Sequence, residues 1–184
     1  RSNMTRNIID IDLDSCIGCH SCAVVCKQEN NVGLGTFYNK VLTVGPNGTY
    51  PDLEMYYLPV ACQHRDNLQC VSVCPTGASY VADDGTVQID VSKCIGCKYC
   101  MAACPYQARV VNEETGAVDK CRFCTVSAET TGTKMCSCVE ACLTNARIFG
   151  DLDDPESDIS KEIAATNAQP IAGDLTKSKV FYVR

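Results

Sequence analysis

Long hydrophobic runs are missing from this chain. Its apolar stretches extend over a few positions only, whereas a helix needs roughly 18 or more apolar residues to cross a bilayer. Basic clusters are missing too, because the 16 Lys and Arg residues are scattered and the formal net charge is -6. Nucleic-acid-binding surfaces need clustered positive charge. We therefore expect neither direct membrane insertion nor a nucleic-acid partner.

Catalytic signatures are also scarce. The chain has only 2 histidines and shows no nucleotide-binding loop, flavin fingerprint or arrangement of catalytic nucleophiles. A Rieske centre would need both His20 and His64 as ligands, in a spacing that the sequence does not have. We expect a protein without a catalytic site of its own.

Cysteine, by contrast, is abundant, with 16 residues in a chain of 184. A density this high is usual in small disulfide scaffolds. Disulfide frameworks, however, have no reason to repeat one tight pattern of four cysteines along the chain. The 46% of hydrophobic residues and the 21% of charged ones suit a soluble protein with one core or two small ones.

Two internal repeats organise the cysteines. Residues 11–19 (IDLDSCIGC) align with residues 89–97 (IDVSKCIGC), which indicates a duplicated chain. In each copy an alternating segment, residues 8–13 or 87–91, predicts a short strand that enters a cysteine loop and a short helix. A second repeat follows the close-spaced cysteines at residues 70–78, 100–108 and 138–146.

The cysteines form four groups, in residues 16–26, 62–74, 94–104 and 121–142. The first and third groups both have the spacing C-x-x-C-x-x-C-x-x-x-C, which is typical of bacterial ferredoxins. Three thiolates on one such loop hold three corners of an iron–sulfur cubane, and the fourth cysteine reaches a neighbouring cluster. The spacing therefore favours iron–sulfur clusters.

Two other metal sites fit less well. Zinc prefers isolated pairs of cysteines separated by a long spacer, and only Cys121 and Cys124 look like such a pair. Cys16-Ile-Gly-Cys19-His20 matches the attachment signature of a c-type haem. We reject that interpretation because the ferredoxin spacing continues beyond it, and because the repeat has Lys98 where His20 stands.

Outside the cysteine groups the sequence predicts a few regular elements. Residues 41–44 and 53–58 suggest a hairpin with its turn at residues 45–48 (GPNG). The polar residues 127–134 suggest an exposed loop. Asp153-Asp154-Pro155 predicts the start of a helix that runs to about Ala165, and residues 179–183 suggest a closing strand.

Further motifs accompany the four groups. They are Ile11-Asp12 ahead of the first group, Tyr50-Pro51 before the second, Cys74-Pro-Thr-Gly-Ala-Ser-Tyr80, Lys120-Cys-Arg-Phe-Cys124, and Phe149-Gly-Asp-Leu-Asp-Asp-Pro155. Over about residues 5–183, groups and motifs together resemble the four-cluster, ferredoxin-like beta subunits of the dimethyl sulfoxide reductase family of molybdenum and tungsten enzymes. Polysulfide, thiosulfate, tetrathionate and arsenate reductases have subunits of this kind.

The resemblance implies an α+β fold, a duplicated bacterial-ferredoxin-like fold with a hairpin insertion and a C-terminal strap. One half is expected in residues 5–26 together with 106–150, holding two clusters. The insertion occupies residues 27–61, the other half residues 62–105, and the strap residues 151–184.

In that family the first group pairs with the fourth, and the second with the third. The implied ligand sets are Cys16, Cys19, Cys22 and Cys142 for one 4Fe-4S cluster, Cys121, Cys124, Cys138 and Cys26 for a second, Cys94, Cys97, Cys100 and Cys74 for a third, and Cys62, Cys70 and Cys104 for an atypical fourth site. Arg65 stands where the family usually has the missing cysteine. Cys136 matches no ligand position, and we expect a free thiol there.

Arg65 cannot replace the cysteine, because its protonated guanidinium offers no lone pair to iron. We favour a 3Fe-4S cluster on the three remaining cysteines. A 4Fe-4S cluster with water, His64 or Asp66 as its fourth ligand comes next, and an empty site last. We expect His64 itself to be a packing or hydrogen-bonding residue beside the cluster.

By resemblance, the chain is an electron-transfer subunit of a molybdopterin oxidoreductase in anaerobic respiration. It would relay single electrons between the catalytic alpha subunit and a membrane quinone-interacting subunit or a soluble carrier. The first and fourth groups would face the catalytic subunit. The alternative is a free-standing soluble polyferredoxin. The N-terminus has neither a signal-peptide core nor a twin-arginine pair, so we favour export with a signal-bearing partner, with a cytoplasmic complex as the alternative.

Overall fold

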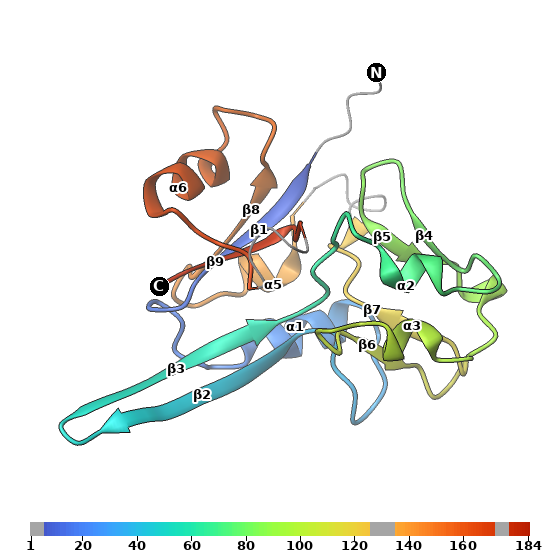
Figure 1. Ribbon diagram of the computed structural model, residues 1–184, viewed down its shortest axis with the longest axis horizontal. Helices are drawn as coiled ribbons and strands as arrows, with labels where there is room; N and C mark the ends of the chain where they lie inside the picture. Colours follow the sequence, from blue (N-terminus) through green and yellow to red (C-terminus); the bar gives the residue numbers. More distant parts are fainter. Residues whose placement is uncertain (1–5, 126–134, 172–176) are drawn as a thin grey trace.

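The computed structural model describes residues 6–125, 135–171 and 177–184 (Figure 1). Its elements, in chain order, are β1 (Asn7–Asp12), α1 (Ser21–Glu29), β2 (Lys40–Thr49), β3 (Asp52–Val60), α2 (Gln69–Ser72), β4 (Ser79–Val81), β5 (Val87–Ile89), η1 (Val91–Lys93), α3 (Tyr99–Ala102), β6 (Arg109–Val111), β7 (Val118–Lys120), α5 (Ser137–Glu140), β8 (Arg147–Asp151), α6 (Asp158–Thr166) and β9 (Val180–Val183). Short helices and small sheets confirm the α+β prediction.

β1 lies at the centre of a three-stranded sheet, antiparallel to β8 and parallel to β9. Ile9 and Ile11 are buried on one face, and Ile8 and Asp10 on the other. Because both faces are covered, the strand needs apolar residues at most positions. The predicted strand at residues 8–13 is confirmed within one residue. The one predicted at residues 87–91 is shorter, because β5 ends at Ile89 and η1 follows.

The 78-residue repeat is present in the hydrogen bonds that lead into the two matching cysteine loops. The N–H of Asp12 donates to the carbonyl of Ala146 at 2.9 Å, and the N–H of Asp90 donates to the carbonyl of Ala78 at 2.8 Å. Each aspartate side chain also accepts an N–H from two residues further on, at 2.9 and 3.0 Å. Each loop is thus held by the residue directly ahead of a strand, β8 or β4, that follows a different cysteine group.

A glycine lies at the middle of each of these loops. Gly18 and Gly96 both have a φ of 67°, a conformation that other residues rarely adopt. A Cβ on Gly18 would lie 2.5 Å from the ring of Tyr57, and one on Gly96 would lie 2.8 Å from the carbonyl oxygen of Gly116. The sharp turn and the close packing both require glycine here.

The helices after the cysteine loops pack in pairs. α1 contacts α5, and α2 contacts α3. The first group therefore lies beside the fourth, and the second beside the third. The hairpins β4–β5 and β6–β7 flank the second pair, and Val118 of β7 donates its N–H to the sulfur of Cys94 at 3.5 Å.

β2 and β3 form a long antiparallel hairpin that projects from the body (Figure 1). The hairpin was predicted, but its turn was misplaced. The chain reverses at Tyr50 and Pro51, and residues 45–48 lie within β2. Pairing is irregular between Val44 and Asn47, because Pro46 has no N–H to donate and the extra residues bulge out of the ladder.

The C-terminal segment packs over the body. α6 contacts β8 and β1, and β9 confirms the predicted closing strand. The predicted helix start is wrong by several residues: α6 begins at Asp158, because the Ser157 hydroxyl caps it by accepting the N–H of Ser160 at 3.3 Å. The predicted loop at residues 127–134 lies outside the described residues.

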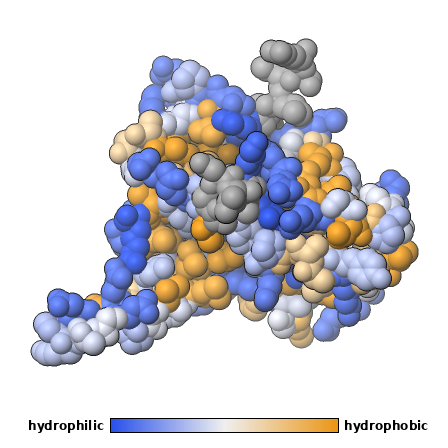
Figure 2. Space-filling model, viewed as in Figure 1, coloured by the Kyte–Doolittle hydropathy of each residue, from blue (hydrophilic) through white to orange (hydrophobic). Residues whose placement is uncertain are grey.

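The surface of the molecule is unevenly polar. Figure 2 shows hydrophilic residues over the projecting end of the hairpin and hydrophobic residues over the body at its base. Among the described residues, no helix is both long enough and apolar enough to cross a membrane.

Candidate metal centres

Two similar cavities lie at the repeated cysteine loops, and we call them the outer cavities. The first is lined by Cys16, Cys19, Cys22 and Cys142, and the second by Cys74, Cys94, Cys97 and Cys100. Each set combines three cysteines of one loop with the last cysteine of the neighbouring group. In both, the second cysteine, Cys19 or Cys97, is exposed.

A third cavity has only buried cysteines in its lining, and we call it the inner cavity. It is lined by five cysteines: Cys26, Cys121, Cys124, Cys136 and Cys138. All five are buried. Four of them are the set expected for the second cluster, and Cys136 is the cysteine that was expected to be a free thiol away from the ligand positions.

The remaining three cysteines, which with Arg65 form what we call the Arg65 site, are gathered around another arginine. Cys62 and Cys70 are buried. Burial works to lower the pKa of Arg109, but the neighbouring sulfurs, including Cys70 and Cys62, leave it raised. Cys104 lies with Arg109 on the wall of an adjoining groove.

Arg65 itself is buried, with 8% of its surface exposed. Its guanidinium carbon lies 5.4 Å from the centre of the Tyr106 ring, within the range of a cation–π contact. Next to it, His64 is 1% exposed and stacks on Phe123 with 3.9 Å between ring centres.

Both ring nitrogens of His64 are engaged. Nδ1 accepts the N–H of Val87 at 3.1 Å, and Nε2 lies 3.1 Å from the carbonyl oxygen of Cys121. A nitrogen facing a carbonyl must carry the proton, so neither nitrogen has a free lone pair for iron. Burial and nearby cations hold the pKa of His64 well below its usual range. The expected hydrogen-bonding role of His64 fits this geometry, whereas a role as an iron ligand does not.

Two buried arginines occupy matching positions, each directly after an Ala that ends a cysteine repeat. Arg147 donates to the sulfur of Cys138 at 3.6 Å and to Oδ1 of Asn39 at 3.3 Å. It lines both the first outer cavity and the inner cavity. Arg109 donates to the hydroxyl of Ser79 at 2.9 Å, bonds the thiol of Cys100 and lines the second outer cavity.

Unsatisfied donors test whether a sulfur-rich group fits these cavities. Arg109 Nη1 and Asn39 Nδ2 are buried donors that lack a hydrogen-bond partner in the described part of the chain. Arg109 lines the second outer cavity and Asn39 the inner cavity. Buried donors are almost always paired in native proteins, and sulfide or thiolate acceptors inside these cavities would pair them. The residues present therefore fit iron–sulfur clusters.

A mononuclear metal fits less well. Within residues 6–125, 135–171 and 177–184, no three His, Cys, Asp or Glu side chains meet closely enough to hold one metal ion. The cysteines instead line shared cavities in sets of four or five.

The thiols of the outer and inner cavities differ in environment. Hydrogen bonding with Ser21 lowers the pKa of the exposed Cys19, whereas burial raises the pKa of Cys26 to about 12. Iron binds the thiolate form. Burial also raises the pKa of Cys22 in the first outer cavity, and the Arg147 guanidinium, which lines both cavities, favours the thiolate form of Cys22 and Cys26.

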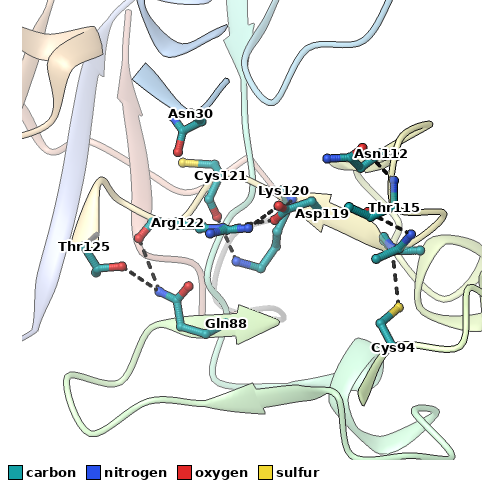
Figure 3. Close-up of polar contacts among 12 residues, drawn as sticks. Asn30, Gln88, Cys94, Asn112, Thr115, Asp119, Lys120, Cys121, Arg122 and Thr125 are labelled. Atoms are coloured by element: carbon teal, nitrogen blue, oxygen red, sulfur yellow. Dashed lines mark hydrogen bonds and ion pairs between the residues drawn. The ribbon is translucent and has the colours of Figure 1, made fainter. Parts of the chain in front are cut away.

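Lys120 supplies a further buried charge, next to Cys121 of the inner cavity (Figure 3), and it also interacts electrostatically with Cys62 of the Arg65 site. It is 0% exposed, and its ammonium group donates to the carbonyl oxygens of Cys121, at 2.8 Å, and of Val87. Burial lowers its pKa, while the sulfurs of Cys62 and Cys121 act in the opposite direction. Figure 3 also shows the Arg122–Asp119 ion pair beside it.

Comparisons with known proteins agree with this chemistry. The family model of the 4Fe-4S dicluster domain matches residues 53–152. A protein of Halobacterium salinarum described as an iron–sulfur subunit of dimethyl sulfoxide reductase is 45% identical, over 98% of the chain and 79% of its own length. A polysulfide reductase chain of Wolinella succinogenes is 43% identical, over 94% of the chain and 91% of its own length. The thiosulfate reductase electron transfer subunit of Salmonella typhi is 45% identical, over 79% and 76%.

This protein belongs to the iron–sulfur beta subunits of the dimethyl sulfoxide reductase family. The resemblance inferred from the motifs is thereby confirmed, and so is the prediction of an electron-transfer subunit that binds 4Fe-4S clusters. As a beta subunit it works within a heteromeric reductase complex and is not the catalytic chain.

Sequence reasoning missed the buried cations of this beta subunit. Arg109 and Arg147 each follow an Ala that closes a cysteine repeat, and this recurrence was a usable signal. Lys120 was noted only as part of a motif. The position of Cys136 on the inner cavity had no sequence signal, because it depends on how the start of α5 is oriented.

Proposed function

We propose that this beta subunit relays single electrons to or from a catalytic subunit that holds molybdenum or tungsten on pterin cofactors. The observation that carries the proposal is the pairing of cysteine groups. Each outer cavity is lined by cysteines from two groups that are far apart in sequence. This is the arrangement of a two-cluster ferredoxin, in which the last cysteine of each run serves the other cluster.

The cavities support the ligand sets that the resemblance implies. Cys16, Cys19, Cys22 and Cys142 would hold one 4Fe-4S cluster, Cys94, Cys97, Cys100 and Cys74 another, and Cys26, Cys121, Cys124 and Cys138 a third. A duplicated ferredoxin-like fold would then have halves in residues 5–26 with 106–150 and in residues 62–105. By sequence, the hairpin β6–β7 falls in the first of these halves and leads into the fourth cysteine group. It also packs against the third group, which belongs to the other half.

When bound, each cluster takes up and gives away one electron. The chain's own residues set how easily this happens. Arg147 and Arg109 place positive charge and N–H donors against sulfur positions, which favours the more negative, reduced form. Burial of the inner cysteines acts in the opposite direction, since a low-dielectric environment disfavours added charge.

The two ends of the electron path would lie at the outer cavities. Cys19 and Cys97 are exposed there, and the neighbouring Ile17 and Ile95 are 57% and 67% exposed. An electron partner can approach closely only where the protein covering is thin. We propose that the half with the first and fourth groups faces the catalytic subunit, and that the other half faces a membrane-bound or soluble electron partner.

At the Arg65 site we propose a 3Fe-4S cluster on Cys62, Cys70 and Cys104. Three thiolates suit that core, and the engaged nitrogens of His64 count against a histidine-ligated 4Fe-4S cluster. Asp66 and water are the other candidates for a fourth ligand. Asp66 is exposed, whereas Arg65, Cys62 and Cys70 are buried, which counts against Asp66 as a ligand.

Iron analysis combined with EPR spectroscopy of anaerobically prepared protein tests these assignments. A 3Fe-4S cluster beside three 4Fe-4S clusters gives about fifteen iron atoms per chain and an EPR signal in the oxidised state. About sixteen iron atoms, without that signal, would favour a non-cysteine ligand. A value of about twelve would overturn both versions of an occupied Arg65 site.

Co-purification tests the partner. A beta subunit that serves one catalytic chain should elute with a molybdenum- or tungsten-containing large subunit at one-to-one stoichiometry. The free polyferredoxin weighed as an alternative should elute as a monomer without such a partner, and that outcome would count against the proposal.

A further inference from the structure

The inner cavity contains one cysteine more than a four-iron cluster needs. Cys136 lines it together with the four proposed ligands, and only 1% of its surface is exposed. It has no disulfide partner. Neither outer cavity has such a surplus, since each is lined by four cysteines only.

Cys136 is also close to the ligands it could replace. Its side chain lines the same cavity as Cys124 and Cys138 and interacts with the thiols of both. It is the N-cap residue of α5, in extended backbone, two residues ahead of Cys138. A sulfur in this position can reach the same corner of the cavity with a side-chain rotation, because rotamer changes move a Cys sulfur without moving the backbone.

We propose that Cys136 is a reserve iron ligand that can take the place of Cys138 or Cys124. The inference rests on the proposed function, because it assumes a four-iron cluster in the inner cavity. In the exchange, the Cys136 thiol loses its proton and its sulfur bonds to iron. The iron–sulfur bond of the departing cysteine breaks, and that sulfur takes up the proton. No electron is gained or lost.

A buried position favours this exchange over loss of the cluster. Water has little access to the inner cavity, whose five cysteines are all buried, so the departing ligand is replaced by the sulfur already beside it. The Arg147 guanidinium, which donates to Cys138, stabilises whichever sulfur is deprotonated at that corner.

Single and double alanine variants test the proposal, since alanine offers no ligand atom. Cys138→Ala should keep the iron content of the wild-type protein, because Cys136 replaces the lost sulfur. Cys136→Ala should also keep it. The double variant should lose about one iron atom per chain and gain the EPR signal of a three-iron cluster. Cys124→Ala, alone and combined with Cys136→Ala, repeats the test at the second contact.

Cys100→Ala is the matched control. Cys100 is the corresponding helical cysteine in α3, and its outer cavity has no fifth cysteine, so this single change should already lose iron. If Cys138→Ala and Cys124→Ala lose as much iron as Cys100→Ala, the proposal is wrong. If the wild-type inner cavity holds no cluster, EPR of the unmodified protein shows two four-iron clusters at most, and the proposed function fails first.

Discussion

The inner cavity and the Arg65 site differ by two cysteines, although the two outer cavities have the same number. The inner cavity is lined by five cysteines, whereas the Arg65 site has three, with an arginine at the fourth position. The outer cavities have four each. A count of sixteen cysteines therefore conceals an uneven distribution.

The comparison also separates two ways of controlling a redox centre. At the inner cavity, Arg147 bonds a ligand sulfur from outside the ligand set. At the other site, Arg65 stands where the resemblance implies a fourth cysteine, and it packs on Tyr106. A cation beside a ligand changes the potential of a cluster, whereas a cation in place of a ligand changes which cluster forms.

The largest expected effect comes from Arg65→Cys, which would make the ligand number of the Arg65 site match that of the outer cavities. Iron content should rise by about one atom per chain, and the three-iron EPR signal should disappear. Arg65→Gln is the control, because it removes the charge without adding a ligand. It should keep the signal and lower its midpoint potential. Unchanged iron content in Arg65→Cys would contradict the assigned geometry.

Replacing Arg147 and Arg109, the two buried arginines in matching positions, tests whether each half has its own buried charge that raises the cluster potentials. Arg147→Met should lower the potentials of the clusters in the first outer cavity and the inner cavity, and Arg109→Met those in the other half. A hydrogen bond from a charged donor contributes about 1.5 to 3 kcal/mol, which corresponds to roughly 60 to 130 mV for one electron. Potentiometric EPR titration measures both shifts.

A surface arginine controls for the loss of charge as such. Arg184 is ion-paired with Glu54 and Asp14 and stacks on Tyr56 at 4.0 Å, and it is not among the residues that line the outer or inner cavities. Arg184→Met should leave every midpoint potential within experimental error. A shift as large as that of Arg147→Met would mean that overall charge, and not the contact with Cys138, determines the potentials.

Lys120→Met should lower the midpoint potentials at both the inner cavity and the Arg65 site, by less than the arginine variants do. Its ammonium group interacts electrostatically with a cysteine of each site but donates to carbonyl oxygens and not to sulfur, so only its charge acts on the clusters. We expect a decrease of about 20 to 60 mV at each, measured in the same titration. Lys161→Met, at an exposed pair with Glu156, is the control. A change at only one of the two sites would contradict the action of Lys120 on both.

The smallest effect concerns Asp10, whose counterpart in the repeat is the uncharged Gln88. Burial raises the pKa of Asp10 above its usual 3.8. Between the pKa of the unfolded chain and the raised pKa of the folded protein, the folded state therefore binds more protons than the unfolded state. The free energy of unfolding must therefore fall as pH rises through that window. Asp10→Asn should remove this decrease and add about 1 kcal/mol above it, because Oδ1 has no partner among the described residues.

Anaerobic denaturant unfolding between about pH 4 and about pH 8 measures this difference. The exposed Asp83→Asn change serves as the control and should leave the pH dependence unaltered. If Asp10→Asn follows the wild-type curve, the buried carboxyl is satisfied by a contact that the structure does not show.

Spacing rules explain why the cysteine loops and strands around them were predictable. The C-x-x-C-x-x-C run forces a tight turn, and Gly18 and Gly96 appear where that turn needs a left-handed residue. Elsewhere, residues typical of turns and helix starts led to wrong predictions. Gly45-Pro46-Asn47-Gly48 looks like a turn but forms a bulge, because the pairing of β2 with β3 continues beyond it. Likewise Ser157, and not Asp154, caps α6.

The environment of the candidate sites was less predictable. Arg109, Arg147 and Lys120 are buried only because segments distant in sequence cover them, and their charge gave no hint of burial. The same holds for Cys136, which a spacing argument places outside every ligand set. A sequence pattern predicts the structure of its own segment, whereas the burial of these residues depends on segments that are distant in sequence.

The C-terminal strand also spans both halves. β9 pairs with β1 of one half, while Ser178 and Lys179, just ahead of it, bond Gln63 and Gly85 of the other. This C-terminal segment therefore contacts both proposed halves and helps to fix the distance between them. Because the rate of electron tunnelling falls steeply with distance, we expect that distance to limit how fast electrons cross from one half to the other, independently of the driving force.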